Sequence, residues 1–187
     1  MRKAVAFGSC LVAIVLPAAA YVPAPNRHYS NVDYEFSVDI PDGLRGCLSE
    51  HTNHGVDILL DRRSTCDSDY DRRPYVDVSA NYNAAVESDT AKGLARIYCR
   101  DRAARQVVWL KGWTLGGRKA AGCRQSFDGD RILVDLMTLR KTDPQNPEVW
   151  IEVGAALTTT TVRYKRDMRL FRRIVQTVRI APDGPLK

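Results

Sequence analysis

Two histidines lie beside carboxylates in the segment EHTNHGVDILLD, residues 50–61. Imidazole and carboxylate groups together can bind a transition metal, which makes His51, His54 and Asp57 candidate metal ligands. Positions three apart face one side of a helix but opposite sides of a strand, and Gly55 with the β-branched residues after it indicates a strand. We therefore expect both histidines at a loop or surface, with no bound metal and no cofactor.

The acidic run DSDYD could in principle bind calcium. Asp67, Asp69 and Asp71 have the spacing of the first ligands of an EF-hand loop. The rest of that loop does not fit, because its glycine position holds Arg72 and its bidentate position holds Val78. A solvated loop with internal ion pairs is the expectation.

Catalytic signatures are missing from the sequence. It contains neither a G-x-S-x-G nucleophile elbow nor an H-E-x-x-H zinc motif. Paired carboxylates remain open, because the fold sets their separation. The strand acids that could act in this way are Glu35, Asp39, Glu87 and Glu152. The sequence favours a non-enzymatic protein, with an envelope hydrolase as the alternative.

The segment YKRDMRLFRRIVQTV, residues 164–178, has apolar residues at helical spacing and many cations. The basic residues in and beside it are Arg163, Lys165, Arg166, Arg169, Arg172, Arg173 and Arg179, against the single acid Asp167. A basic amphipathic helix can bind an acidic protein or an anionic envelope surface, and Arg169, Arg172 and Arg173 are the candidate partner-binding residues. Alternatively, the arginines are only the solvated side of a helix that packs on the core.

Residues 1–20, MRKAVAFGSCLVAIVLPAAA, have the charged start, apolar centre and small-residue end of a secretory signal peptide. Loss of Arg2 and Lys3 from the 28 basic residues leaves 26 against 22 acids, a net charge of +4. No second apolar span follows. We expect a periplasmic or secreted protein without a transmembrane segment after cleavage, and no nucleic-acid partner.

Four cysteines remain after removal of the signal peptide with its Cys10. They are Cys47, Cys66, Cys99 and Cys123, an even number suited to an oxidising compartment. Three pairings are possible; we favour Cys47 with Cys66 and Cys99 with Cys123, because each closes a short loop. A four-cysteine zinc site would need a closely spaced pair, which the sequence lacks.

Hydrophobic periodicity and turn residues divide the mature chain into an extended arm over 21–32, a domain over 33–180 and a tail over 181–187. The expected elements are strands at 34–40, 55–60 and 74–82, a helix at 89–104, a hairpin about Asp128-Gly129-Asp130, a strand at 147–159 and a helix at 164–178. This order, three strands and a helix followed by three strands and a helix, indicates a single α+β domain. We expect an antiparallel sheet of about six strands covered by two helices and stapled by two disulfides.

The element order, the entry strand FSVDIPDGL and the closing hairpin, strand and RDMRLFRRIVQTV helix resemble the Mog1/PsbP-like sandwich over residues 33–180. This resemblance implies an antiparallel sheet covered by helices and a binding, assembly or accessory role. The expected function is an exported, non-catalytic protein-binding or accessory protein of the bacterial periplasm, such as an immunity-type inhibitor. A further alternative is a small-ligand binder with an apolar pocket lined by Trp109, Trp113 and Trp150.

Overall fold

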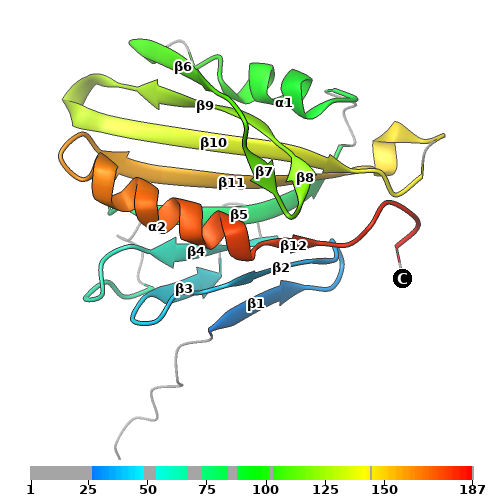
Figure 1. The fold of residues 1–187 in the computed structure, drawn as a ribbon, viewed down its shortest axis with the longest axis horizontal. Helices are drawn as coiled ribbons and strands as arrows, with labels where there is room; N and C mark the ends of the chain where they lie inside the picture. The colour runs from blue at the N-terminus through cyan, green and yellow to red at the C-terminus, as the bar shows by residue number, and fades with distance from the viewer. Residues whose placement is uncertain are drawn as a thin grey trace, which may run out of the picture.

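The structure is a computed structural model that describes residues 27–48, 54–66, 73–83, 88–101, 103–143 and 145–186 (Figure 1). Its centre is a seven-stranded antiparallel sheet in the order β3-β4-β5-β11-β10-β9-β6. The strands are β3 (Arg45–Leu48), β4 (Gly55–Leu59), β5 (Tyr75–Tyr82), β6 (Gln106–Leu110), β9 (Ala121–Ser126), β10 (Arg131–Arg140) and β11 (Ile151–Thr160). The α+β class is confirmed, with seven strands in the main sheet where about six were expected.

A second sheet of three strands lies beside the main one. It has the order β1-β2-β12, with β1 at His28–Asn31, β2 at Phe36–Asp39 and β12 at Arg179–Ile180. The predicted entry strand is therefore β2, and it pairs on one side with residues expected in the N-terminal arm. On its other side it pairs with the chain that leaves the last helix.

The hairpin predicted about Asp128-Gly129-Asp130 is confirmed as the antiparallel pair β9 and β10. A 3₁₀ turn at Asp128–Asp130 joins the strands, and Gly129 has a φ of 72°, which favours glycine. A second 3₁₀ turn, Pro147–Val149, precedes β11. The short hairpin of β7 (Thr114–Leu115) and β8 (Arg118–Lys119) lies between β6 and β9 in the chain.

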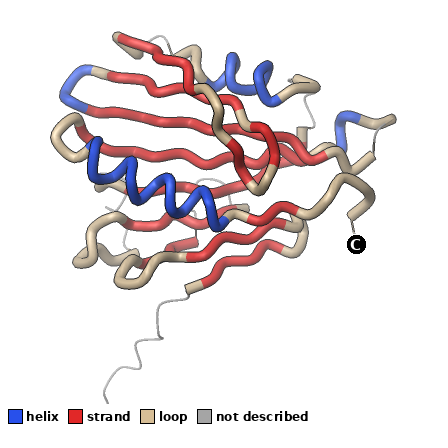
Figure 2. Tube along the Cα trace, viewed as in Figure 1, coloured by secondary structure: helices blue, strands red, loops and turns tan. Residues whose placement is uncertain are grey.

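The two helices pack on opposite faces of the main sheet. Arg124 of β9 lies over the ring of Tyr164, so helix α2 (Tyr164–Thr177) covers the face of the sheet to which Arg124 points. The neighbouring residue Cys123 points to the other face, where it bonds to Cys99 at the end of helix α1 (Ala91–Tyr98). Figure 2 shows the two helices well apart, with α2 across the sheet and α1 near its β6 edge. No helix among the described residues is long and apolar enough to span a membrane.

Helix α1 is shorter than the predicted 89–104. Its N-cap is Thr90, whose hydroxyl accepts a hydrogen bond from the backbone N–H of Gly93 at 3.1 Å. The helix ends at Tyr98, and its C-cap Cys99 forms the disulfide to Cys123 that ties it to β9. Both favoured pairings, Cys47–Cys66 and Cys99–Cys123, are confirmed.

The core lies between α2, β2 and one face of the main sheet. Alternate strand residues such as Ile58, Val78 and Val153 meet Phe171 and Ile174 of α2 there, all of them fully buried. Residues 181–184, predicted to lie in the C-terminal tail, are held beside the end of β10 by hydrogen bonds. The buried Arg140 donates to the carbonyl oxygens of Pro182 at 2.9 Å and Gly184 at 3.2 Å.

Candidate functional site

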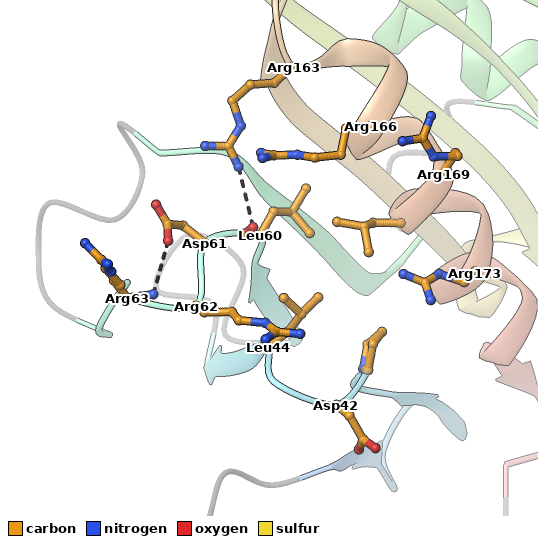
Figure 3. Close-up of a pocket in the computed structure, with 12 residues that line it drawn as sticks. Asp42, Leu44, Leu60, Asp61, Arg62, Arg63, Arg163, Arg166, Arg169 and Arg173 are labelled. Atoms are coloured by element: carbon orange, nitrogen blue, oxygen red, sulfur yellow. Dashed lines mark hydrogen bonds between the residues drawn. The ribbon is translucent and has the colours of Figure 1, made fainter.

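A cavity of about 780 Å³ lies between α2, the turn that joins β2 to β3, and the segment after β4 (Figure 3). Its charged lining consists of Arg62, Arg63, Arg163, Arg166, Arg169 and Arg173 with the acids Asp42 and Asp61. Its apolar lining consists of Pro41, Leu44, Leu60 and Leu170. The cavity therefore combines an excess of positive charge with an apolar floor.

Helical spacing brings the α2 arginines to one side of the cavity. Arg166, Arg169 and Arg173 are three and four residues apart and so follow one face of the helix, as Figure 3 shows. The apolar residues Met168, Phe171 and Val175 occupy the opposite face and are buried. Burial of that face against the sheet leaves the arginine face directed at the cavity.

One fully buried carboxylate holds the first two arginines in place. Asp167 accepts hydrogen bonds from Arg163 Nε at 3.1 Å, Arg166 Nε at 3.0 Å and the Thr159 hydroxyl at 2.6 Å. Its position in the first turn of α2 also places negative charge near the helix N-terminus, which is favourable. Arg163 and Arg166 therefore share a counter-ion, while no described acid forms an ion pair with the arginines farther along the helix.

The other four arginines of the cavity have no ion pair within the described part of the chain. The acids near them are already engaged: Asp42 pairs with Arg27 at 3.3 Å, and Asp61 Oδ1 accepts from the backbone N–H of Arg63 at 3.1 Å. A guanidinium group presents a planar fork of donors that fits a carboxylate or phosphate. The cavity is thus suited to bind an anionic group.

The structure separates the three arginines selected from the sequence. Arg169 and Arg173 line the cavity, whereas Arg172 lies over the ring of Trp113, 4.5 Å from its centroid. Arg62 and Arg63 were not among the residues selected from the sequence, although the segment DRRSTC, residues 61–66, places these two arginines next to each other. Only the contact between this loop and α2 shows that they belong to the same site.

His54 and Asp57 do not converge on a metal site. The ring of His54 packs on Tyr34 at 4.8 Å, on the core side of the sheet, and Asp57 points to the opposite side, where it pairs in register with Asp77. Among the described residues, no group of three metal-binding side chains occurs. His51 and the calcium candidates Asp67, Asp69 and Asp71 lie outside the described residues.

The candidate tryptophans also occupy separate environments. Trp109 lines a cavity beside α1, and Trp113 lies under Arg172. Trp150 is buried, and its indole N–H donates to the carbonyl oxygen of Asp143 at 2.5 Å. The three rings therefore do not line one pocket.

Three candidate catalytic acids are engaged in structural contacts. Glu35 pairs with Arg140 at 2.5 Å, Asp39 with His28 at 2.7 Å, and Glu152 accepts from the hydroxyl of Tyr98 at 3.3 Å. Glu87 lies outside the described residues. The three described acids, Glu35, Asp39 and Glu152, are not brought together in one cleft.

A row of aspartates crosses the sheet on the α1 face. Asp57 pairs in register with Asp77, which pairs with Ala156, which in turn pairs with Asp135. Burial, reinforced by the charge of Asp57, raises the pKa of Asp77 to about 7, and burial raises the pKa of Asp135 to about 6. No sequence motif marks this row, because the three residues meet only through strand pairing.

Asp77→Asn is expected to stabilise the chain above neutral pH. The folded-state pKa of Asp77 is above its unfolded value of 3.8, so the folded chain binds the extra proton and stability falls as pH rises from about 4 to about 7. Asparagine is always neutral and retains an acceptor for the Ser79 hydroxyl, which donates to Asp77 Oδ1 at 2.6 Å. We expect a gain of at least about 1.4 kcal/mol, the equivalent of one pKa unit, at pH 8.

Urea unfolding at pH 4 and pH 8 measures this effect. The free energy of unfolding of Asp77→Asn should exceed that of the parent at pH 8 and approach it at pH 4. Asp33→Asn, at an exposed carboxylate, is the control and should change neither value. An unchanged slope of stability against pH in Asp77→Asn would contradict the assignment.

No protein-family model matches the chain, and no curated protein matches its sequence. Solved structures of similar fold include two that cover most of this chain. The solution structure of cyanobacterial PsbP (CyanoP) from Synechocystis sp. PCC 6803 has a TM-score of 0.53 and 13% identity, covering 89% of this chain and 99% of that one. LpqN of Mycobacterium tuberculosis has a TM-score of 0.53 and 14% identity, covering 79% and 83%. The chain therefore has a PsbP/Mog1-like fold, as its resemblance to that sandwich predicted.

Proposed function

We propose that the chain is an exported, non-catalytic accessory protein that binds an acidic segment of another protein in the arginine-lined cavity. The observation that carries the proposal is the gathering of four arginines without described ion pairs in one cavity. Two disulfides support an oxidising, extracytoplasmic location, in agreement with the signal peptide expected at residues 1–20. The similar fold of LpqN, described as involved in cell envelope biogenesis, supports an envelope-related role.

The shape of the cavity favours a protein segment over a flat membrane surface. Its arginines come from two sides, α2 and the loop after β4, and Leu44 and Leu60 form part of the lining between them (Figure 3). An acidic side chain can enter this space and form paired hydrogen bonds with a guanidinium while neighbouring apolar atoms contact the leucines. An immunity-type inhibitor of a secreted toxin would be one protein of this class.

Reversing two charges in the cavity tests the proposal. A fluorescein-labelled octaglutamate peptide, followed by anisotropy at low salt, should bind the chain of residues 21–187. Arg169→Glu combined with Arg173→Glu should weaken binding at least about tenfold, because a close charge pair at a protein interface can contribute about 1.5 kcal/mol or more. Added salt should weaken the parent's binding and have little effect on the double variant.

The matched control reverses the same number of charges elsewhere. Arg96→Glu with Arg100→Glu changes two exposed arginines in and after α1 and should retain most of the binding. Equal losses in both double variants would show that net charge alone attracts the peptide, which contradicts the proposal. Stronger binding of the parent to anionic lipid vesicles than to the peptide, lost in the cavity variant, would assign the cavity to a membrane surface instead.

A further inference from the structure

Strand β6 forms one edge of the main sheet and is unusually open. It pairs with β9 on one side, and no described strand pairs with its other side. Its five residues, QVVWL, include no charge and no proline, and the exposed fractions of Val107, Val108 and Trp109 are 37%, 38% and 48%. Edge strands are normally protected by charges, proline or a bulge, because their free backbone groups can pair with another chain. β6 lacks the first two of these protections.

The opposite edge of the sheet differs. Strand β3 has four residues, begins with the charged Arg45, and is tied through Cys47 to Cys66. The sulfur of Cys66 also lies 3.7 Å from the carbonyl oxygen of Gly46. Of these two edges, β6 therefore has the longer uncharged stretch available for pairing.

A cavity of about 790 Å³ adjoins the C-terminal half of β6. Trp109, Leu110, Ala120, Ala121 and Leu139 supply apolar surface, and the N-terminal residues of α1 close one side. Lys92, Lys111, Lys119 and Lys141 also line it. Of its two acids, Asp183 is engaged by Arg118 at 2.7 Å and by the backbone N–H of Lys141 at 2.8 Å. The cavity is thus apolar inside and cationic at its margin.

We propose that β6 and this cavity bind an extended segment of another protein, apolar in its centre and acidic at its ends, as an added β-strand. The backbone of the segment would pair with the open edge of β6, and its apolar side chains would cover Trp109 and enter the cavity. Its carboxylates would lie near the lysines. Peptide capture by strand addition explains the open backbone edge, the apolar surface and the cationic margin together.

A second copy of this chain fits the edge less well. Symmetric antiparallel pairing of two β6 strands about Val108 would place Arg105 of each copy opposite Lys111 of the other. Like charges directly opposite in a sheet are destabilising. A strand with acidic ends would meet Lys111, and Arg105 beside its ion pair with Asp128, with opposite charge.

A designed peptide tests the inference. The probe is acetyl-Glu-Thr-Val-Thr-Val-Thr-Glu-amide, whose two valines lie opposite Val107 and Trp109 when its glutamates lie opposite Arg105 and Lys111. It has two controls: one carries lysine at both ends, and the other carries proline in place of the central threonine. Titration by isothermal calorimetry should show binding of the first peptide only. Amide hydrogen exchange in residues 106–110 should slow when it binds.

Trp109→Lys places a charge at the open edge and should weaken peptide binding at least about tenfold, as expected for an interface aromatic residue. Its control is Leu48→Lys, the same kind of change at a side chain 77% exposed on the opposite edge strand β3, which should bind like the parent. Unchanged circular dichroism in both variants establishes that they fold. Equal affinity of the parent and Trp109→Lys would overturn the inference, as would a parent dimer that Trp109→Lys dissociates.

The two proposed surfaces are distinguishable. The arginine-lined cavity lies toward the β3–β4 end of the sheet and β6 at the other end. The Arg169→Glu, Arg173→Glu variant should therefore bind the designed strand like the parent. If that variant lost strand binding while Trp109→Lys kept it, the peptide would belong to the arginine-lined cavity. This result would overturn the strand-addition inference but not the proposed function.

Discussion

Asp167→Ala is expected to lower the free energy of unfolding by about 3 kcal/mol, because it removes the acid from a buried ionic network. Asp167 is fully buried and accepts from Arg163, Arg166 and the Thr159 hydroxyl. The buried hydroxyl then has no acceptor, and the cations lose their counter-charge. The loss should fall in the lower part of the range for buried pairs, because the Arg166 side chain is 55% exposed and can be rehydrated by water.

Thermal unfolding measures this effect as a decrease in Tm of about 6 to 12 °C for a chain of this size. Asp42→Ala is the control, since Asp42 pairs with Arg27 at the surface and should contribute less than about 1 kcal/mol. Asp167→Asn should be intermediate, because it retains an acceptor for Thr159 but no charge. Similar stability losses in Asp167→Ala and Asp42→Ala would show that burial adds nothing to this network.

The double variant Cys99→Ala, Cys123→Ala is also expected to lose about 3 kcal/mol of stability. The disulfide spans 24 residues, and opening a loop of that length restores conformational entropy to the unfolded chain. Both cysteines are buried, so alanine avoids placing a hydroxyl in the core. An eight-residue helix is marginal by itself, which makes the attachment of α1 to β9 depend on this bond and on the packing of Leu94 and Ala95.

The other disulfide provides the matched control. Cys47→Ala with Cys66→Ala opens a loop of 19 residues and should cost a similar free energy, measured by urea unfolding. Only loss of Cys99–Cys123 should also weaken binding of the designed strand, because residues 89–92 line that cavity. Equal strand binding in both double variants would show that α1 keeps its place without the bond.

Local patterns in the sequence were sufficient for the elements with a strong period. The helix at 164–178 was predicted from the spacing of Met168, Phe171 and Ile174, and α2 buries all three. The Asp-Gly turn predicted the β9–β10 hairpin, since few residues adopt a positive φ as readily as glycine. The disulfide pairs were also predictable, because both join cysteines close in the chain.

Elements without a local period could not be found in this way. Strand β6 exposes Val107, Val108 and Trp109 alike, so it lacks the alternation of a half-buried strand, and only pairing with β9 makes it part of the sheet. Helix α1 was predicted too long because Ala103 and Ala104 continue a helical composition beyond Cys99. The disulfide at Cys99 and the hydrogen bond of Arg105 N–H to Ser126 mark where the chain leaves the helix for the sheet.

The sequence by itself determined the α+β class and the existence of an arginine-rich helical face, because each depends on residues close in the chain. It favoured the two disulfide pairs that the structure contains but left the other two pairings open. Tertiary structure alone decided the composition of the sites. It placed Arg169 and Arg173 with Arg62 and Arg63 and turned Arg172 toward Trp113. It also aligned Asp57 with Asp77 and left β6 open. These arrangements arise from contacts between segments far apart in the chain, which no local spacing specifies.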